Sequence, residues 1–557
     1  MVERMSLPSR RFVLTGAAAS AAAFLVACSD DTGNPGRADS STLTGEEDAT
    51  PEPTPDPVLV AREVAEAKGL SGDAAGLAAA VSGLLLERSR VAVLAPEDDS
   101  LTAAAATLAA ASRWPVLVGD AREALPEATV AELSRLGVEH VVQVVPSAAT
   151  ATATATATSG GSGSDPATGT PTPSTPAPSA PSAPGANLPA SIQVTTLRAD
   201  EVGAPPADLP LGEELNDWPM LVLVSTAAPA GAALATLEAL GARALTGVVD
   251  PREDATVMGA LRESPDLPIV TLAADEQNAG ALLVTGRMAQ RAPELPGGGV
   301  TLFPHRRMVA LYGHPGSPVL GLLGEQGIES SIERIGTYVD RYSPLVAERV
   351  IPAFEIIASV ATAAAQPDNS YSHIWPPETF RAWVDAAKEA GVYVVLDLQP
   401  GRTDFLTQAK AYVELLVEPH VGLALDPEWR LGPDERHLVR IGSVDAAEIN
   451  SVSEWLAELV REHDLPQKVL TLHQFRLSMI RDRDQVRTDH PEIAVVLHAD
   501  GQGGQAAKQD TWRTLKADLP DGMWLGWKNF YDEDSPMLTP EQTVAQVDPT
   551  PWFISYQ

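Results

Sequence analysis

The sequence predicts an α/β protein in which parallel α/β domains precede a C-terminal (β/α)8 barrel of the TIM type. Short apolar segments alternate with amphipathic or alanine-rich segments, as strands alternate with helices. The last block, residues 301–557, contains eight such strands and has the length of an α/β barrel. With 557 residues, of which 44% are hydrophobic, the chain can form several ordinary cores. An open, doubly wound sheet is the alternative for the last block.

The first 28 residues have the layout of an export signal. Arg10 and Arg11 precede a short apolar stretch that ends in Leu-Val-Ala-Cys28, and this stretch is too short for a comfortable membrane span. The final tetrapeptide resembles a bacterial lipobox, whose cysteine becomes the lipid-bearing N-terminus, and the arginine pair resembles a twin-arginine (Tat) signal. We therefore expect export and lipid anchoring through Cys28 to the outer face of the cell membrane. Residues 29–57 are acidic and lack core-forming residues, so they predict a disordered tether.

Residues 58–146 predict the first α/β domain. An amphipathic stretch is followed by strands at 91–95, 115–118 and 141–145, with helices at 101–112 and near 127–136 between them. This alternation predicts a parallel layer.

Part of this domain resembles cell wall binding repeat 2 of Gram-positive surface proteins. The resemblance covers residues 88–146 and rests on the strand at 91–95, the acidic residues 97–99 before the alanine-rich helix, and the segment Trp114 to Val118. It implies a small α/β fold that holds the protein to anionic wall polymers. Leu101-Thr102 and Pro146 depart from the family pattern, and residues 219–273 resemble a degenerate second copy.

A segment rich in Ala, Thr, Pro and Ser, residues 147–187, predicts a disordered linker. A second α/β domain, 188–300, follows it. The linker is either a true boundary or an insertion within one larger domain. The expected strands are 192–195, 220–224, 244–248 and 269–272, and the expected helices are 228–240, 254–263 and 274–290.

The barrel block supplies eight strands, and helices are expected between most of them. The strands are 308–312, 350–356, 392–398, 421–426, 469–473, 493–498, 523–527 and 552–556. The helices are 325–341, 376–390, 403–416, 445–463, 475–487 and 505–517. No helix follows the last strand, and the helix at 274–290 is a candidate to fill that gap in the ring.

Polar residues gather where these strands end, which is where α/β barrels carry their functional side chains. We expect Glu355, His473, His498, Lys528, Tyr531 and Trp552 to bind substrate. The full set of polar strand-end residues is His314, Glu355, Asp397, Asp426, Glu428, His473, Gln474, His498, Asp500, Lys528 and Tyr531, and Trp552 opens the last strand.

The most informative motif is Asp426-Pro-Glu428 at the end of an apolar strand. Two carboxylates two residues apart face the same way in extended backbone, and their mutual repulsion lets one remain protonated as an acid. The motif resembles the Asp-x-Glu of chitinase-like and lysozyme-like barrel hydrolases, although Ala424 stands where the chitinase pattern has a further Asp. The resemblance implies that Glu428 is the catalytic acid and Asp426 its partner. Asp397 or Asp500 could supply a second catalytic carboxylate.

Other interpretations of the same residues remain open. Carboxylates at strand ends are also common helix caps, which would make the barrel a non-catalytic binding module. His314, His473 and His498, with Asp397 or Asp426, could hold a divalent metal as in barrel amidohydrolases, although the first-strand His-x-His of that family is absent. Lys528 is either a Schiff-base lysine or a cation–π partner of nearby aromatic rings.

Composition excludes several classes of function. A single Cys rules out internal disulfides and Cys-based metal clusters, and a net charge of −35 argues against binding nucleic acid. The loop Gly501 to Gly504 lacks the spacing of a nucleotide-binding loop, and we expect no cofactor. The expected partners are the membrane, through the lipid, and a cell-envelope polysaccharide or peptidoglycan. The sequence therefore predicts a wall-associated lipoprotein whose barrel binds, or binds and hydrolyses, an envelope glycan, with a non-catalytic scaffold or a metal-dependent hydrolase as alternatives.

Overall fold

The computed structural model describes residues 57–147, 187–215, 218–437 and 439–557. The predicted signal peptide with Cys28 lies outside the described residues, as do the tether and the linker apart from their end residues 57, 147 and 187. Among the described residues, no helix combines the length and the apolar character that a membrane crossing requires.

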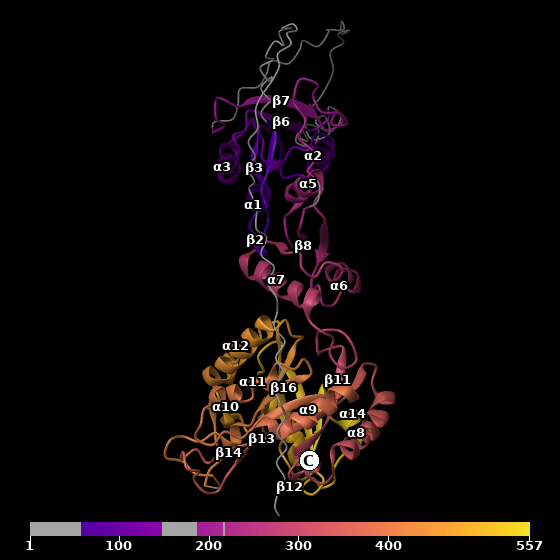
Figure 1. Cartoon of the computed structure of the whole chain (residues 1–557), viewed down its shortest axis with the longest axis vertical. Helices are drawn as coiled ribbons and strands as arrows, with labels where there is room; N and C mark the ends of the chain where they lie inside the picture. Colours follow the sequence, from indigo (N-terminus) through magenta and orange to yellow (C-terminus); the bar gives the residue numbers. More distant parts are fainter. Residues whose placement is uncertain (1–56, 148–186, 216–217, 438) are drawn as a thin grey trace, which may run out of the picture. The chain divides into compact units, whose positions relative to one another are not determined.

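Two parallel four-stranded sheets form the α/β region, residues 57–300 (Figure 1). The first sheet has the order β5 (Val116–Val118), β4 (Val91–Ala95), β6 (His140–Val145) and β7 (Gln193–Arg198). The second has the order β2 (Lys68–Ser71), β10 (Ile269–Ala273), β8 (Leu221–Ser225) and β9 (Ala244–Val248). Each sheet therefore contains strands from both sides of the predicted linker.

The helices of the α/β region follow the expected positions closely. A small antiparallel pair, β1 (Leu59–Ala61) and β3 (Leu86–Ser89), flanks the first helix. The helices are α1 (Ala74–Leu85), α2 (Asp99–Ser112), α3 (Glu127–Leu136), α5 (Gly231–Ala239), α6 (Ala255–Arg262) and α7 (Glu276–Arg291).

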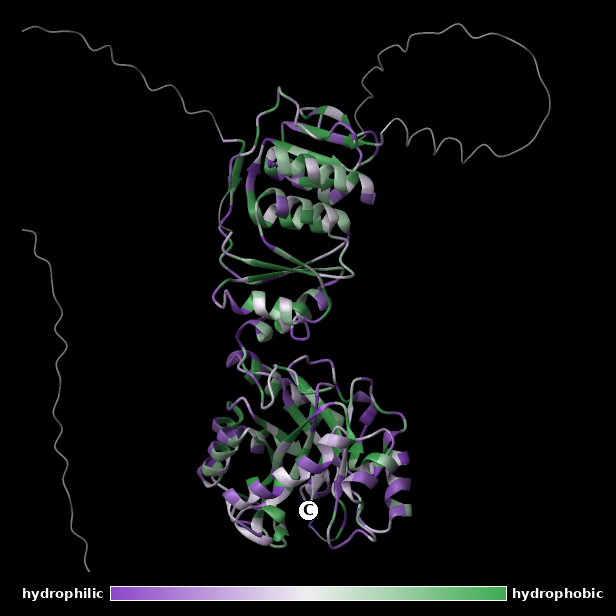
Figure 2. Cartoon of the chain, turned by 90° about the vertical axis from the view of Figure 1, so that its right-hand side faces the viewer, coloured by the Kyte–Doolittle hydropathy of each residue, from purple (hydrophilic) through white to green (hydrophobic). Residues whose placement is uncertain are grey.

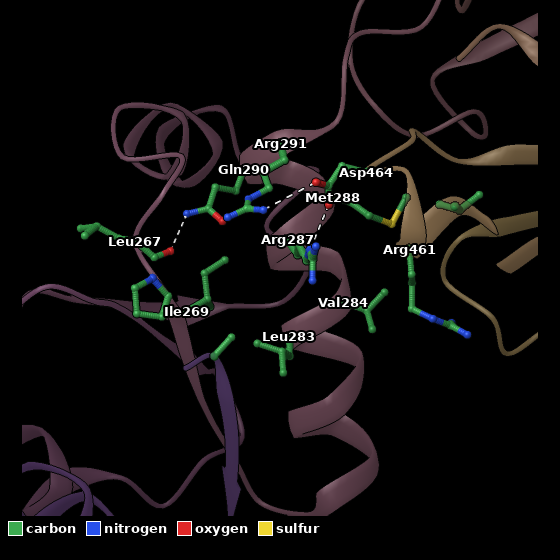
Figure 3. A pocket seen from close by; sticks show the side chains of 13 residues that line it. Leu267, Ile269, Leu283, Val284, Arg287, Met288, Gln290, Arg291, Arg461 and Asp464 are labelled. Carbon is green, nitrogen blue, oxygen red and sulfur yellow. Dashed lines mark hydrogen bonds and ion pairs between the residues drawn. The ribbon is translucent and has the colours of Figure 1, made fainter. Parts of the chain in front are cut away.

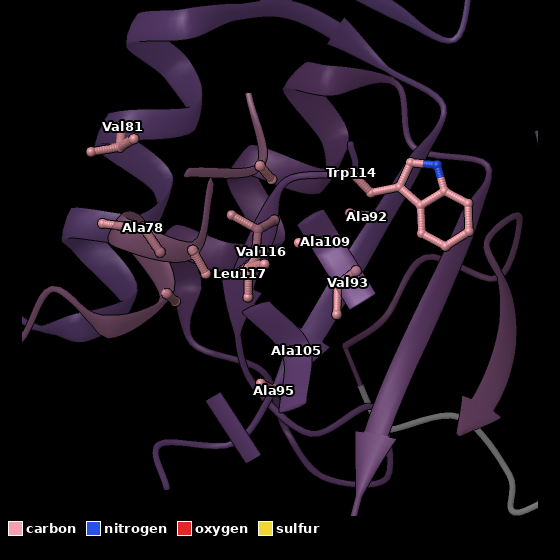
Figure 4. Close-up of a cluster of buried hydrophobic side chains, with 14 of the residues drawn as sticks. Ala78, Val81, Ala92, Val93, Ala95, Ala105, Ala109, Trp114, Val116 and Leu117 are labelled. Atoms are coloured by element: carbon pink, nitrogen blue, oxygen red, sulfur yellow. The ribbon is translucent and has the colours of Figure 1, made fainter. Parts of the chain in front are cut away.

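The core of the α/β region joins the segments before and after the linker. Trp114 is fully buried in a cluster of small aliphatic side chains from α1, α2, β4 and β5 (Figure 4). Its indole Nε1 donates a hydrogen bond to the carbonyl of Pro210 at 3.0 Å. Thr236 on α5 accepts a hydrogen bond from the amide of Val116 on β5 at 2.9 Å. Residues 58–146 thus complete their packing with residues from 188–300.

The barrel, residues 301–557, is a closed ring of eight parallel strands, which confirms the predicted fold class and excludes the open sheet. Figure 1 shows helices around this ring. Two short strands, β12 (Ser317–Gly321) and β14 (Ser372–Ile374), extend it as antiparallel partners of its first two strands. The ring order is β11 (Arg306–His314), β13 (Arg349–Ala361), β15 (Tyr393–Leu398), β16 (Val421–Leu425), β18 (Lys468–Gln474), β20 (Ile493–Ala499), β21 (Trp524–Asn529) and β22 (Phe553–Tyr556).

Hydrophilic and hydrophobic residues alternate along the barrel helices (Figure 2), and α9 (Glu378–Ala390), for example, buries Phe380, Trp383, Val384 and Ala387 on one side. The barrel helices are α8 (Ile328–Tyr342), α9 (Glu378–Ala390), α10 (Phe405–Ala411), α11 (Val413–Leu416), α12 (Ala446–Glu462), α13 (Gln505–Lys516) and α14 (Pro540–Gln546).

Two expectations about the barrel helices are wrong. Residues 475–487 form two 3-10 turns and the short strand β19 (Ile480–Arg481), which pairs with β17 (Val444–Asp445), instead of a helix. The Arg483 side chain explains this, because it donates to the carbonyls of Leu515 and Ala517 and fixes the segment against α13. Helix α7 does not fill the gap after the last strand, because it packs on β2 and β10. The structure has one helix beyond those expected, α14, which lies between β21 and β22 and so precedes the last strand.

Candidate functional site

The parallel register of the barrel brings most of the predicted site residues to one end. Tyr312 on β11 is paired with Glu355 on β13, and His473 on β18 is paired with His498 on β20. The carboxyl ends of β15, β16, β20 and β21 complete the same layer. The predicted residues that meet there are Glu355, Asp397, Asp426, Glu428, His473, His498, Asp500 and Lys528.

His473 is the centre of this cluster. Its Nε2 lies 3.0 Å from Glu355 Oε1 and 3.9 Å from Asp397 Oδ1, while its Nδ1 lies 3.1 Å from Asp500 Oδ2. Burial alone would lower the pKa of His473, but the charge of Glu355 and the hydrogen bonds to Asp500 and Glu355 raise it well above the usual value. The imidazole is thus a cation held between carboxylates.

The two carboxylates that contact His473 most closely are ionised. Burial would raise the pKa of Glu355, but the charge of His473 outweighs burial and lowers it to about 2. Burial would also raise the pKa of Asp500, but the hydrogen bond from His473 outweighs burial and lowers that pKa. The neighbouring His498 is neutral, because burial lowers its pKa to about 3.

Asp397 has a different environment. Its Oδ2 accepts a hydrogen bond from the Tyr312 hydroxyl at 2.9 Å. Burial raises the pKa of Asp397 to about 6. Lys528 extends over the Tyr312 ring, with Nζ 3.3 Å from the ring centroid, which is cation–π geometry.

The Asp-Pro-Glu motif after β16 carries two carboxylic acids. Asp426 is buried, and burial together with the charge of Glu428 raises its pKa well above the usual value. Glu428, in a 3-10 turn (Pro427–Trp429), is half-buried, and burial followed by the charge of Asp500 raises its pKa to about 7. One strand end therefore presents groups that can still hold protons near neutral pH, beside the ionised Asp500.

These acids face an open cavity with a volume of about 570 Å³. Asp426, Glu428, Asp500 and Lys528 line it, as the sequence analysis expected of strand-end residues. Its aromatic and basic walls were not among the predicted site residues, and they are formed by Tyr312, Trp429, Phe475, Arg476 and Phe530. Tyr312 ends the expected strand 308–312, and Trp429 is adjacent to Glu428. Phe475 and Phe530 lie two residues after His473 and Lys528, respectively. This proximity to strand ends and predicted site residues was the available signal.

A second, shallower cavity of about 320 Å³ shares Glu428 and Trp429 with the first. The Trp429 ring lies 5.3 Å from the His437 ring in an edge-to-face contact. Glu428 and Trp429 therefore belong to the lining of both cavities.

Buried Lys508 and Asp534 hold the rim of the main cavity in place. Lys508 Nζ donates to Asp534 Oδ2 at 2.6 Å and to the carbonyl of Lys528 at 2.8 Å. Asp534 also accepts hydrogen bonds from the amides of Gly503 and Phe530. The glycine-rich loop 501–504 is thereby tied to the end of β21.

Two of the expected substrate-binding residues lie elsewhere. Trp552 precedes β22 and so lies at the amino ends of the strands, where its ring packs 6.0 Å from Phe303 and 5.2 Å from Trp524. Arg307 covers it at 4.0 Å. Tyr531 follows β21 but does not line the cavity, because its hydroxyl contacts that of Tyr338 on α8.

His314 and Gln474, two further strand-end residues, also point away from the cavity. The His314 ring lies 4.9 Å from Trp375 and 5.9 Å from Phe380 on α9. The pairing of β11 with β12 shifts register between Gly313 and His314, so the alternation that points Tyr312 inward does not extend to His314. The Gln474 amide donates to the carbonyl of Arg476.

Two overlapping groups at the barrel end have the donor types and spacing of a metal site. Glu355, His473 and His498 each offer a ligand atom within 4.8 Å of the others, and so do Asp426, His473 and Asp500. The predicted metal set is therefore brought together in part, because His473 and His498 meet while His314 does not.

A cavity of about 330 Å³ lies away from this cluster, against α7 and β10 (Figure 3). Its walls are mostly aliphatic, including Leu267, Ile269 and Leu283. The one acid among its lining residues, Asp464, is paired with Arg287 at 2.9 Å and Arg291 at 3.6 Å. This cavity lacks the convergent carboxylates of the barrel end.

Comparison with known proteins finds no family model and no curated protein that matches the chain. Two solved structures are similar in part. One is a new form of a xylanase-A-amylase inhibitor protein, with 12% identity over 45% of this chain and 92% of that chain, at a TM-score of 0.28. The other is a xylanase and α-amylase inhibitor protein from Scadoxus multiflorus, with 13% identity, the same two coverages and a TM-score of 0.26. The assignment of the barrel rests on its own strand order.

Proposed function

We propose that the barrel binds a glycan of the cell envelope and hydrolyses it, with Glu428 as the proton donor. The observation that carries this proposal is a protonatable Glu428 beside an ionised Asp500 on the wall of one open cavity. Glycoside hydrolysis needs an acid for the leaving oxygen and a second carboxylate near the sugar ring.

The walls of the cavity suit a sugar. Trp429, Phe475 and Phe530 offer flat apolar faces, while Gln399, Gln502 and Arg476 offer hydrogen-bond donors. In this role Glu428 donates its proton to the glycosidic oxygen, and Asp500 stabilises the positive charge that develops on the ring. Asp426, the other acid of the motif, also favours its protonated form, because burial and the charge of Glu428 raise its pKa.

The test is an assay of purified wall glycans with wild type, Glu428→Gln and Glu533→Gln. Glu533 is the matched control, because it is another glutamate that lines the same cavity. We expect Glu428→Gln to lower kcat by about 100-fold or more, the usual effect of losing a general acid, while the control retains activity. Equal activity in all three proteins would remove Glu428 from this role. Retention of wild type on wall polymers without any turnover would establish the non-catalytic alternative.

We further propose that the chain is a lipid-anchored envelope protein whose residues 88–146 contact wall polymers. Support comes from the Leu-Val-Ala-Cys28 motif and from the resemblance to cell wall binding repeat 2. Metabolic labelling with an alkyne fatty acid is expected to mark the wild type and to leave Cys28→Ser unlabelled. Equal labelling of both would contradict the anchor.

A further inference from the structure

We infer that Glu355, His473 and His498 bind one divalent transition-metal ion, such as Zn²⁺, beneath the floor of the barrel cavity. This site goes beyond the proposed glycan chemistry and does not depend on it. Glu355 lies in the middle of β13, level with the ends of β18 and β20 that carry His473 and His498, and the three side chains have no exposed surface.

The spacing of the donor atoms fits one ion. His473 Nε2 lies 3.0 Å and His498 Nδ1 lies 3.8 Å from Glu355 Oε1, and all three ligand atoms fall within 4.8 Å. Zinc ligands at their usual bond lengths stand about 3.3 Å apart around a tetrahedral ion. Small side-chain rotations are therefore enough to close the site, and two imidazoles with one carboxylate are a donor set typical of zinc and iron.

The far side of each imidazole is already held in the way that metal-binding histidines require. His473 directs its other nitrogen, Nδ1, at Asp500 Oδ2, 3.1 Å away. His498 directs its other nitrogen, Nε2, at the Ser555 hydroxyl, 3.1 Å away. A carboxylate or hydroxyl on the second nitrogen fixes the ring for coordination through the first nitrogen. At His473 the metal ion takes the place of the proton that Nε2 holds toward Glu355, because a metal-binding imidazole is neutral.

The cluster also contains atoms that lack partners. Within the described chain, Glu355 Oε2 and His498 Nδ1 are buried and make no hydrogen bond. In the tautomer in which His498 Nε2 donates to Ser555, the lone pair of Nδ1 faces the Glu355 carboxylate, 3.8 Å away, and is open to a metal ion. Across the described residues, no Lys or Arg nitrogen lies within 4.0 Å of Glu355. A cation between these atoms would satisfy them both.

The alternative group, Asp426, His473 and Asp500, shares His473 but would use it with two carboxylates. The pair of imidazoles therefore favours the Glu355 site.

The experiment uses tag-free protein that is stripped with a chelator, incubated with Zn²⁺ or Co²⁺ and desalted before metal analysis. We expect about one equivalent of metal per chain for wild type. Glu355→Gln and His498→Gln should bind at least tenfold more weakly, and Asp500→Asn should lose about 10- to 100-fold in affinity, the range for an outer-shell carboxylate. His314→Gln, which changes a buried histidine outside the cluster, should bind like wild type.

The Co²⁺ spectrum makes the test independent of the variants' folding. Wild type should show visible absorption of nitrogen- and oxygen-bound Co²⁺ without a thiolate charge-transfer band, which separates this site from Cys28. Wild type that retains no metal after desalting, or metal bound equally by Glu355→Gln and His498→Gln, would overturn the proposal. Glycan turnover is not measured, so this outcome is distinct from failure of the proposed hydrolysis.

Discussion

At the scale of single residues, the barrel end separates carboxylates into two protonation states by their neighbours. The pKa of Asp500 is lowered because its carboxylate accepts a hydrogen bond from the imidazole of His473. The pKa of Glu428 is raised to about 7 because the residue is partly buried and lies near the negative charge of Asp500. The nearby charge of Lys528 opposes that rise. A carboxyl group is therefore ionised or protonated according to what lies beside it.

The raised pKa of Glu428 predicts a pH profile. Because a proton donor must be protonated, activity should fall as the pH rises through about 7. Lys528→Met removes a charge that lowers the pKa of Glu428, so it should move this alkaline limb to higher pH. The measurement is kcat/KM against pH, with Lys410→Met, a change on α10, as a control that leaves the limb in place. A limb that stays fixed or moves to lower pH in Lys528→Met would contradict the assignment.

At the scale of elements, β16 is the strand that ends at the Asp-Pro-Glu motif, and it pairs in parallel with β18. Gly422 on β16 leaves no space for a side chain. A Cβ there would lie 2.5 Å from Val469 Cγ1 and 2.8 Å from both the Val469 carbonyl oxygen and the Tyr393 hydroxyl. The close approach of these strands therefore depends on glycine.

We expect Gly422→Ala to destabilise the protein by about 1–3 kcal/mol, because overpacking a rigid core displaces backbone atoms. Gly259→Ala is the control, since Gly259 lies inside α6 with nothing within 4 Å of its Cβ position. That substitution should stabilise by up to about 1 kcal/mol, because alanine is the better helix former. Denaturant unfolding measures both. Equal destabilisation by the two substitutions would show that the contact at β16 is not the cause.

The barrel elements show what the sequence can predict. All eight strands were recognisable, because buried parallel strands are continuous apolar runs such as the one before Asp426. The segment 475–487 was not, because a distant contact, Arg483 to the end of α13, decides its path. Among site residues, Trp552 was misplaced because a residue that opens a strand lies at the opposite end from one that closes it. His314 was misplaced by a register shift that no local pattern reveals.

At the scale of the whole chain, the α/β region is built from two stretches that share their sheets. β7 pairs with β6 across the predicted linker, and β2 pairs with β10. Neither stretch completes a sheet without the other. The sequence showed the elements on both sides but left open whether they form one domain or two.

This sharing predicts the behaviour of fragments. Residues 57–147 expressed alone should fail to unfold cooperatively, because β6 and the faces of α1 and α2 lose their partners. Co-expression of 57–147 with 187–557 should give a complex that purifies together. Circular dichroism during thermal unfolding and size exclusion check both points. A cooperatively folded 57–147 fragment would contradict the prediction.

Ring closure has a consequence for damaged copies of the protein. β22 is the strand that joins β21 to β11, and its Ser555 also contacts His498 in the buried cluster. A chain cut before Phe553 would leave two long unpaired edges, which are templates for aggregation. The same cut would remove a contact of the proposed metal site. Truncated molecules would thus lose their solubility and the proposed metal site together, so that few soluble but defective copies would accumulate beside intact ones.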